Sequence, residues 1–101
     1  MTSMTLWLRP FLFAMSDWEK LRYRAFRRDG FMCRECSRYG LHVAAERAHH
    51  VWPEDEYPEY SRELWNILSL CKPCHDRMHE RGSRRLTALG LWWLRRTRPP
   101  F

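Results

Sequence analysis

Two short segments, Cys33-Arg34-Glu35-Cys36 and Cys71-Lys72-Pro73-Cys74, carry all four cysteines of the chain and decide its fold. Each has the Cys-x-x-Cys spacing, and 34 residues separate the two pairs. Two such pairs are typical of a tetrahedral zinc site, because each offers two thiolates from one tight turn. The protein would fill all four ligand positions, so this zinc would be structural. Reduced structural pairs and redox thiols are the less favoured alternatives.

The chain has 101 residues, which limits it to one small domain and excludes a multidomain enzyme. A domain of this size has a marginal core, so we expect a metal to help it fold. Lys and Arg number 18 against 12 Asp and Glu, and 16 of the 18 are arginine. Both ends are basic and residues 54–76 are acidic. Because guanidinium groups bind phosphate bidentately, nucleic acid is the expected partner and an anionic membrane the weaker alternative.

Residues 4–15 are apolar, but Arg9-Pro10 interrupts them and they are too few to span a bilayer. No charged region precedes them, so we expect neither a signal peptide nor a membrane-spanning helix. The expected location is cytoplasmic, where cysteines stay reduced. Because all the motifs follow Met15, residues 1–15 are interpreted as an N-terminal extension.

Capping signals and apolar spacing predict three helices. The first spans about residues 17–28, because Ser16-Asp17-Trp18-Glu19 has the spacing of a capping box. Its arginine face is either solvated or lies along DNA. The second helix opens at the second cysteine pair and closes at Gly82. The third is the amphipathic stretch Arg84 to Arg96, within a basic, Trp-containing tail over residues 83–101.

Three roles are open to this tail: lying on DNA, binding a partner, or covering the zinc core. We favour the last, with DNA contacts from its arginines, because Trp at helical spacing is usually buried. Between the helices, residues 41–44 and 47–52 are predicted to pair as a hairpin. Residues 53–60 are acidic and hold two prolines, so they should form an exposed loop, and residues 64–70 return to the core.

Four of the five histidines form pairs outside the cysteine motifs. His75 and His79 lie one turn apart on the predicted second helix, so they could bind one cation together. A zinc protease is excluded, because Asp76 stands where such enzymes carry their general-base Glu. His49 and His50 should point to opposite faces of a strand, so that one can bind metal while the other accepts a proton. His42 is interpreted as a surface or half-buried strand residue.

The order and spacing of these motifs resemble the HNH endonuclease family, in the branch whose ββα-metal site is braced by a four-cysteine zinc. The resemblance covers about residues 17–82 and assigns residues 16–82 to the nuclease domain. The residues that carry it are Arg28-Asp29-Gly30-Phe31-Met32-Cys33-Arg34-Glu35-Cys36, Ala48-His49-His50-Val51-Trp52-Pro53, Asn66-Ile67-Leu68-Ser69-Leu70-Cys71-Lys72-Pro73-Cys74-His75, and His79. It implies a small α+β fold, treble-clef-like, with flanking N- and C-terminal helices.

The resemblance also implies roles for individual residues. His49, His75 and His79 would hold one divalent cation, and His50 would be the general base that deprotonates water. Asn66 would not touch substrate but would fix the loop that presents the catalytic histidine. Three imidazoles favour Zn, Ni, Co or Mn over Mg. The acidic loop 54–59 departs from the Gly-containing loop of many relatives, and it either folds away from the site or restrains it.

The expected function is therefore metal-dependent hydrolysis of DNA, leaving 5′-phosphate and 3′-hydroxyl ends, in a phage or mobile-element protein. Double-stranded DNA is the expected substrate, and the candidate DNA-binding residues are Arg27, Arg28, Arg84, Arg85, Arg95 and Arg96. Two alternatives remain: a non-catalytic zinc module that binds nucleic acid, and an adaptor with a protein partner in a DNA-processing complex.

Overall fold

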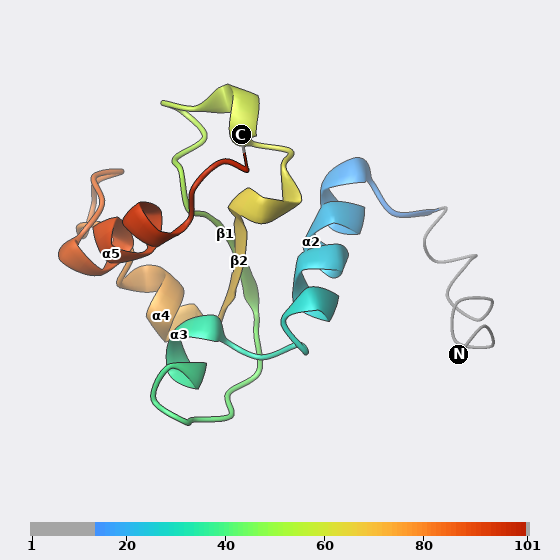
Figure 1. Cartoon of the computed structure of the whole chain (residues 1–101), viewed down its shortest axis with the longest axis horizontal. Coiled ribbons are helices and arrows are strands. Elements are labelled where there is room, and N and C mark those ends of the chain that lie inside the picture. Colours follow the sequence, from blue (N-terminus) through green and yellow to red (C-terminus); the bar gives the residue numbers. More distant parts are fainter. Residues whose placement is uncertain (1–13, 101) are drawn as a thin grey trace.

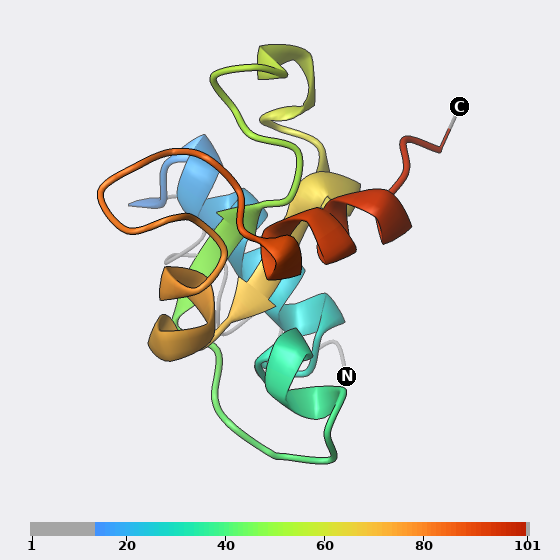
Figure 2. The ribbon, with the colours of Figure 1, turned by 90° about the vertical axis from the view of Figure 1, so that its left-hand side faces the viewer.

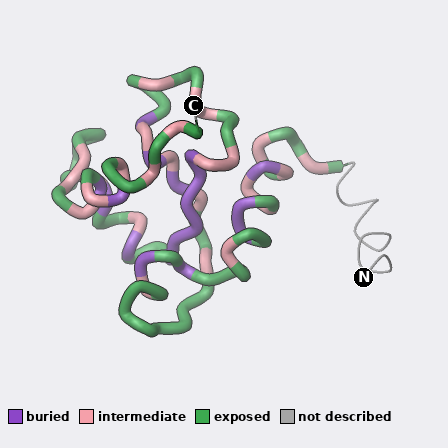
Figure 3. Tube along the Cα trace, viewed as in Figure 1, coloured by how far each residue is buried: buried purple, intermediate pink, exposed green. Residues whose placement is uncertain are grey.

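The centre of the computed structural model, which describes residues 14–100, is a pair of antiparallel strands. β1 (Arg47–His50) pairs with β2 (Ile67–Leu70), and His49 lies opposite Leu68. All four residues of β2 are buried, as the tube in Figure 3 shows along the middle of the molecule. One long α-helix lies on one side of the strands, and the shorter α-helices lie on the other (Figure 1). This small α+β arrangement confirms the predicted fold class.

The long helix, α2 (Asp17–Arg28), has the predicted bounds. The hydroxyl of Ser16 accepts a hydrogen bond from the Glu19 backbone N–H at 3.1 Å, which is the N-cap that the sequence indicates. Leu21 and Ala25 are buried against Ile67, so α2 covers the face of the sheet that carries the even-numbered residues of β1.

The predicted hairpin between residues 41–44 and 47–52 is wrong. β1 takes β2 as its partner, and Ala44 instead makes an isolated bridge with Met32. The physical reason is burial: residues 41–44 are all exposed, whereas β2 is buried along its whole length. Pairing β1 with β2 removes more apolar surface from water than a local hairpin would.

The second helix is also shorter than predicted. After α3 (Arg34–Ser37), the next helix on this side is α4 (Lys72–Asp76), which ends well before Gly82. The carbonyls of Arg77 and Met78, which a longer helix would need, accept hydrogen bonds from Thr87 instead. His79 therefore lies outside α4, in an isolated bridge with Leu86, so the predicted helical spacing of His75 and His79 is wrong.

The C-terminal helix, α5 (Ala88–Arg96), begins four residues later than predicted, directly after its N-cap Thr87. It lies across the side of the sheet opposite α2 (Figure 2). Trp93 is buried in the cluster that contains the cysteines, and its indole N–H donates to Glu35 Oε1 at 3.0 Å. At Gly90 a side chain would collide with the Met78 carbonyl, so this glycine permits the close approach of α5. The helix thus covers the cysteine core, as favoured from the sequence.

Residues 53–60 form the expected acidic loop, which ends in the short helix η1 (Pro58–Tyr60). A second short helix, η2 (Leu64–Asn66), leads directly into β2. The interpretation of residues 1–15 as an extension falls almost wholly outside the described residues. Within residues 14–100, no helix is long and apolar enough to cross a membrane.

Candidate functional site

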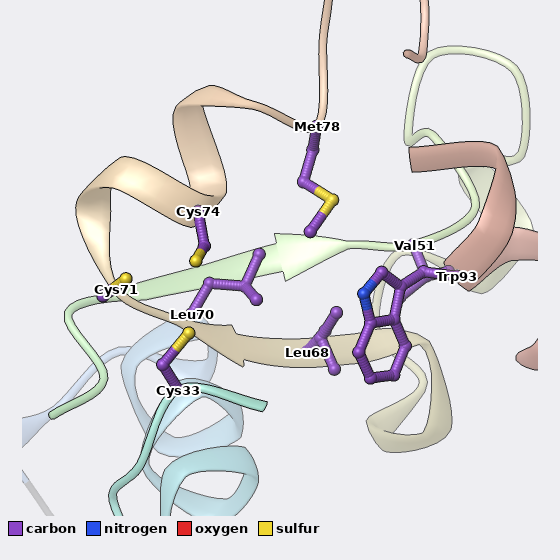
Figure 4. Close-up of a cluster of buried hydrophobic side chains, with 8 residues drawn as sticks. All are labelled: Cys33, Val51, Leu68, Leu70, Cys71, Cys74, Met78 and Trp93. Atoms are coloured by element: carbon purple, nitrogen blue, oxygen red, sulfur yellow. The ribbon is translucent and has the colours of Figure 1, made fainter. Parts of the chain in front are cut away.

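The four cysteine side chains form one cluster between α3, α4 and the end of β2. Their sulfur atoms all lie within 4.8 Å of one another. Cys33 and Cys71 are the N-cap residues of α3 and α4, so two helix starts present the two pairs to each other. Figure 4 shows Cys33, Cys71 and Cys74 close to Leu70. The structure confirms that the two distant motifs build one group that could hold a metal.

The electrostatics of this cluster favour a bound cation. Burial raises the pKa of Cys36 and of Cys74, and the neighbouring thiols raise that of Cys36 further. Burial also opposes ionisation of Cys33, but hydrogen bonds, led by that from the Cys36 N–H, lower its pKa. Four thiolates this close repel one another unless a cation lies among them. Four sulfur donors with this separation fit one tetrahedral ion.

A second group of possible ligands is formed by three histidines beside β1. The ring of His49 lies 5.6 Å from that of His75 and 5.4 Å from that of His79, measured between ring centroids. α4 supplies His75, and the bridge between His79 and Leu86 brings the third ring to the strand. Among residues 14–100, the cysteines are the one set of potential ligands whose donor atoms all lie within 4.8 Å, so the histidine group is the more open.

His49 is the most unusual residue of this group. It is 2% exposed, and its Nε2 is buried without a hydrogen-bond partner among the described residues. Burial, followed by the charges of His75, His79 and His50, lowers the pKa of His49 to about 3. Burial and His79 lower the pKa of His75 as well. A neutral imidazole with a free lone pair is the form that binds a metal ion, so these residues fit a divalent cation.

The three histidines open into a cleft of about 300 Å³. Its other lining residues are Ala48, His50, Pro53, Glu54, Asp55 and Arg84. The acidic loop therefore does not fold away: two of its carboxylates lie at the cleft. Arg84 forms an ion pair with Asp55 at 3.6 Å, which joins the two loops at its edge.

His50 lies next to His49 in the strand, but its side chain is held from the opposite face. Its Nε2 is 2.9 Å from the Ser61 carbonyl oxygen, and the Trp18 ring of α2 stacks on it. Since a carbonyl only accepts, Nε2 carries the proton of this bond and Nδ1 is left as the acceptor. Glu54 Oε2 is 3.9 Å from the same Nε2. The arrangement leaves one basic nitrogen on a ring whose orientation is held by two contacts.

Asn66 is fully buried at the start of β2 and connects this strand to the loop that follows β1. Its Oδ1 accepts from the Trp52 N–H at 2.7 Å. Its Nδ2 donates to the carbonyls of Trp52 and Tyr60, both at 3.1 Å. These bonds lie within the backbone of the loop that carries the cleft carboxylates, so Asn66 holds the loop and does not face the cleft.

The six candidate DNA-binding arginines are dispersed over the surface. Arg84 lines the cleft, whereas Arg28 donates internally to Asp29 and to the carbonyls of Leu64 and Ile67. Arg85 lies 3.8 Å from Glu80. Arg96 packs on the Trp92 ring, and both Arg27 and Arg95 are exposed.

Sequence reasoning missed two residues around these sites. Trp18 was assigned only to the apolar face of the first helix, and nothing local indicates that it meets His50. Glu35 lies within the first cysteine motif, and an acidic side chain at such a position is ordinarily expected to be exposed to solvent. In the fold it is buried between Arg38 and Trp93.

The fold of this chain is shared with a solved structure. The HNH endonuclease of the deep-sea thermophilic bacteriophage GVE2, crystallised with a manganese ion, aligns with a TM-score of 0.59. The alignment covers 75% of this chain and 82% of the phage protein, at 24% sequence identity. At this identity the likeness shows a common fold.

The sequence comparison agrees with the fold. Residues 33–81 match the HNH endonuclease family. This HNH region runs from the first cysteine to just past His79, so it includes both clusters and confirms the resemblance indicated by the motifs. It supports a nuclease in general terms. A comparison with curated proteins gives no match.

Proposed function

We propose that this protein is a metal-dependent endonuclease that hydrolyses DNA phosphodiester bonds at the histidine cleft. The observation that carries the proposal is the buried, neutral and unpartnered Nε2 of His49, beside His75 and His79. A buried nitrogen without a partner costs free energy, and a ligated cation would remove that cost. The match of residues 33–81 to the HNH family supports the same reaction class.

His49, His75 and His79 would hold the cation, and Cys33, Cys36, Cys71 and Cys74 would hold a structural zinc. The cation at the histidines would stabilise the negative charge that develops on the phosphate and on the leaving oxygen. Three imidazole donors favour Zn, Ni, Co or Mn over Mg. The structural ion would join α3 to α4 and so fix the helix that carries His75.

His50 would be the general base. Its Nε2–H donates to the Ser61 carbonyl, and its Nδ1 can take a proton from the attacking water. The water oxygen bonds to phosphorus while the bond to the 3′ oxygen breaks, which leaves 5′-phosphate and 3′-hydroxyl ends. Trp18 and Ser61 hold the ring, and Asn66 holds the loop that ends at Ser61.

We propose double-stranded DNA as the substrate. The basic ends of the chain support a nucleic-acid partner in general, because a phosphate backbone attracts arginine-rich surfaces. Inside the cleft, Arg84 is the one arginine among the lining residues. We propose that it binds a phosphate after release from Asp55. A phage or mobile-element origin agrees with the bacteriophage source of the structural relative.

The test is plasmid cleavage with Mg, Mn, Ni, Co or Zn added singly. We expect metal-dependent cleavage by the wild type and loss of cleavage in His50→Ala. His42→Ala is the matched control, because His42 is exposed and lies outside the cleft. Equal activity in all three proteins would refute the role of His50.

The competing function is a zinc module that binds DNA without cutting it. The exposed carboxylates of Glu54 and Asp55 at the cleft favour this alternative, because they repel a phosphate. It would be supported if the wild type and His50→Ala bind DNA equally with steep salt dependence and neither cleaves it.

A further inference from the structure

A second pocket, of about 570 Å³, shares no lining residue with the histidine cleft. It lies between the C-terminal helix, the first cysteine motif and β2, and four arginines and three tryptophans line it. Three of its eleven lining residues come from α5, which lies beyond the region that matches the HNH family. The arginines are Arg28, Arg34, Arg38 and Arg96, and the tryptophans are Trp65, Trp92 and Trp93.

Two of the guanidinium groups pack on a single ring. The Cζ of Arg38 lies 3.5 Å from the centroid of Trp92, and that of Arg96 lies 3.8 Å from it. Two groups this close to one ring centre must lie on its two faces, so Trp92 separates them. Packing of this kind limits the freedom of both side chains, and it leaves the N–H groups at their edges available to a ligand.

The acids near the pocket do not neutralise it. Asp29 pairs with Arg28 at 2.7 Å and with Arg34 at 3.2 Å, and Glu35 pairs with Arg38 at 2.7 Å. Both carboxylates are only 2–3% exposed, whereas the three paired arginines are 28–44% exposed. Four positive groups therefore meet two buried negative ones, and an incoming ligand encounters the guanidinium groups first.

The pocket also has more hydrogen-bond donors than acceptors. Within the described chain, the guanidinium group of Arg96 donates a hydrogen bond only to the Trp92 carbonyl of its own helix, at 3.2 Å. Trp65 also lines the pocket, but its indole Nε1 is buried, so the donors that a ligand can reach are the guanidinium groups. Guanidinium groups only donate, so the complementary ligand is an anion rich in acceptor oxygens.

We infer that this pocket is a second phosphate-binding site, which holds the DNA backbone away from the point of cleavage. The inference rests on the proposed function for the identity of its ligand, because a free phosphate ion would offer the same oxygens. Arg38 and Arg96 contact the phosphate, while Glu35 holds Arg38 in place and Asp29 holds the neighbouring Arg28 and Arg34. The C-terminal helix thus extends the DNA-binding surface of the HNH region.

The test compares Arg38→Gln and Arg96→Gln with Arg98→Gln, which removes the same charge two residues from Arg96 but outside the pocket. Affinity for a short labelled duplex is measured by anisotropy over a salt series, without added divalent cation. We expect the two pocket variants to lose several-fold in affinity, and the slope of log K against log salt to fall by about 0.9 for each lost contact. Arg98→Gln should keep the wild-type slope.

Equal losses in all three variants would overturn the inference, because they would reflect overall charge alone. A parallel titration with inorganic phosphate, followed through the indole N–H signals of Trp65 and Trp92, distinguishes the two ligands. We expect duplex DNA to displace phosphate from the pocket and so to reverse the phosphate-induced shifts of these signals. If DNA does not displace the phosphate, the pocket is not a DNA site. Binding can be measured without cleavage, so the two inferences can fail separately. If the wild type cleaves no DNA but the pocket variants still bind DNA more weakly than Arg98→Gln, the proposed function is refuted and the phosphate site is supported.

Discussion

The indole ring of Trp18 lies flat against the imidazole of His50, with ring centroids 5.0 Å apart and an angle of 18° between the planes. Trp18 belongs to α2, outside the HNH region, whereas His50 ends β1 inside it. The contact and the bond to Ser61 hold the ring from its face and from its edge. A general base must keep its nitrogen in line with the attacking water, so this stacking bears directly on the proposed reaction.

Trp18→Ala should lower kcat about tenfold and leave KM nearly unchanged, because it frees the His50 ring without touching DNA; a general base contributes roughly 10²–10⁴ in total. Trp18→Phe keeps a flat ring and should retain most of the activity. Steady-state cleavage of a labelled duplex gives both constants. A rise in KM at constant kcat would show that Trp18 binds DNA instead.

Cys71→Ser should unfold the domain, whereas His50→Ala should leave its melting temperature close to that of the wild type. The first variant removes a ligand from the cluster that joins α3 to α4, and the second removes a half-buried side chain at the cleft. Thermal melts followed by circular dichroism, with zinc content measured by elemental analysis, check this. We expect one zinc per folded chain. Similar melts for the two variants would contradict the division into structural and catalytic roles.

Folding stability should fall as the pH falls from about 6.5 towards 3, because of His49. In the unfolded chain this histidine takes up a proton near pH 6.5, whereas burial holds its pKa at about 3 in the fold. The contribution of His49 to folding stability is fully present above its pKa in the unfolded chain. Below that pKa the contribution is lost by about 1.4 kcal/mol per pH unit. Denaturant melts between about pH 7.5 and 5 measure the slope. His49→Gln should have a shallower slope than the wild type, and an identical slope would contradict the assignment.

Asn66→Ala should destabilise the protein by about 2–3 kcal/mol, because it leaves buried backbone groups of Trp52 and Tyr60 without partners. Ser61→Ala is the control in the same loop: it removes one exposed bond, to the Pro58 carbonyl, and should cost less than about 1 kcal/mol. Chemical denaturation gives both values. Equal losses would indicate that Asn66 does not hold the loop.

The parts of the fold that follow from neighbouring residues could be predicted. The Ser16 cap and the apolar spacing after it place α2 at its observed bounds. The two cysteine pairs form one cluster because each pair needs only a tight turn. Of the predicted strand over residues 47–52, residues 47–50 form β1, which ends at His50.

The parts of the fold that depend on contacts between distant residues could not be predicted from the sequence. The pairing of β1 with β2 reflects the apolar area buried between segments about twenty residues apart, and no local signal ranks it above a hairpin with residues 41–44. The end of α4 at Asp76 is set by Thr87, which takes the carbonyls of Arg77 and Met78. His79 still approaches His49, but through a bridge and not through a helical turn.

By itself, the sequence determined the chemical inventory of this protein: four thiols in two pairs, two pairs of histidines, and an arginine-rich surface. Side-chain type and short spacing are properties of the chain alone. The tertiary structure alone decided that His49 is buried against His75 and His79, that Trp18 lies on His50, and that Arg38 and Arg96 flank Trp92. These contacts form only when separate segments pack around a common core, and the free energy of that packing depends on all of these segments together.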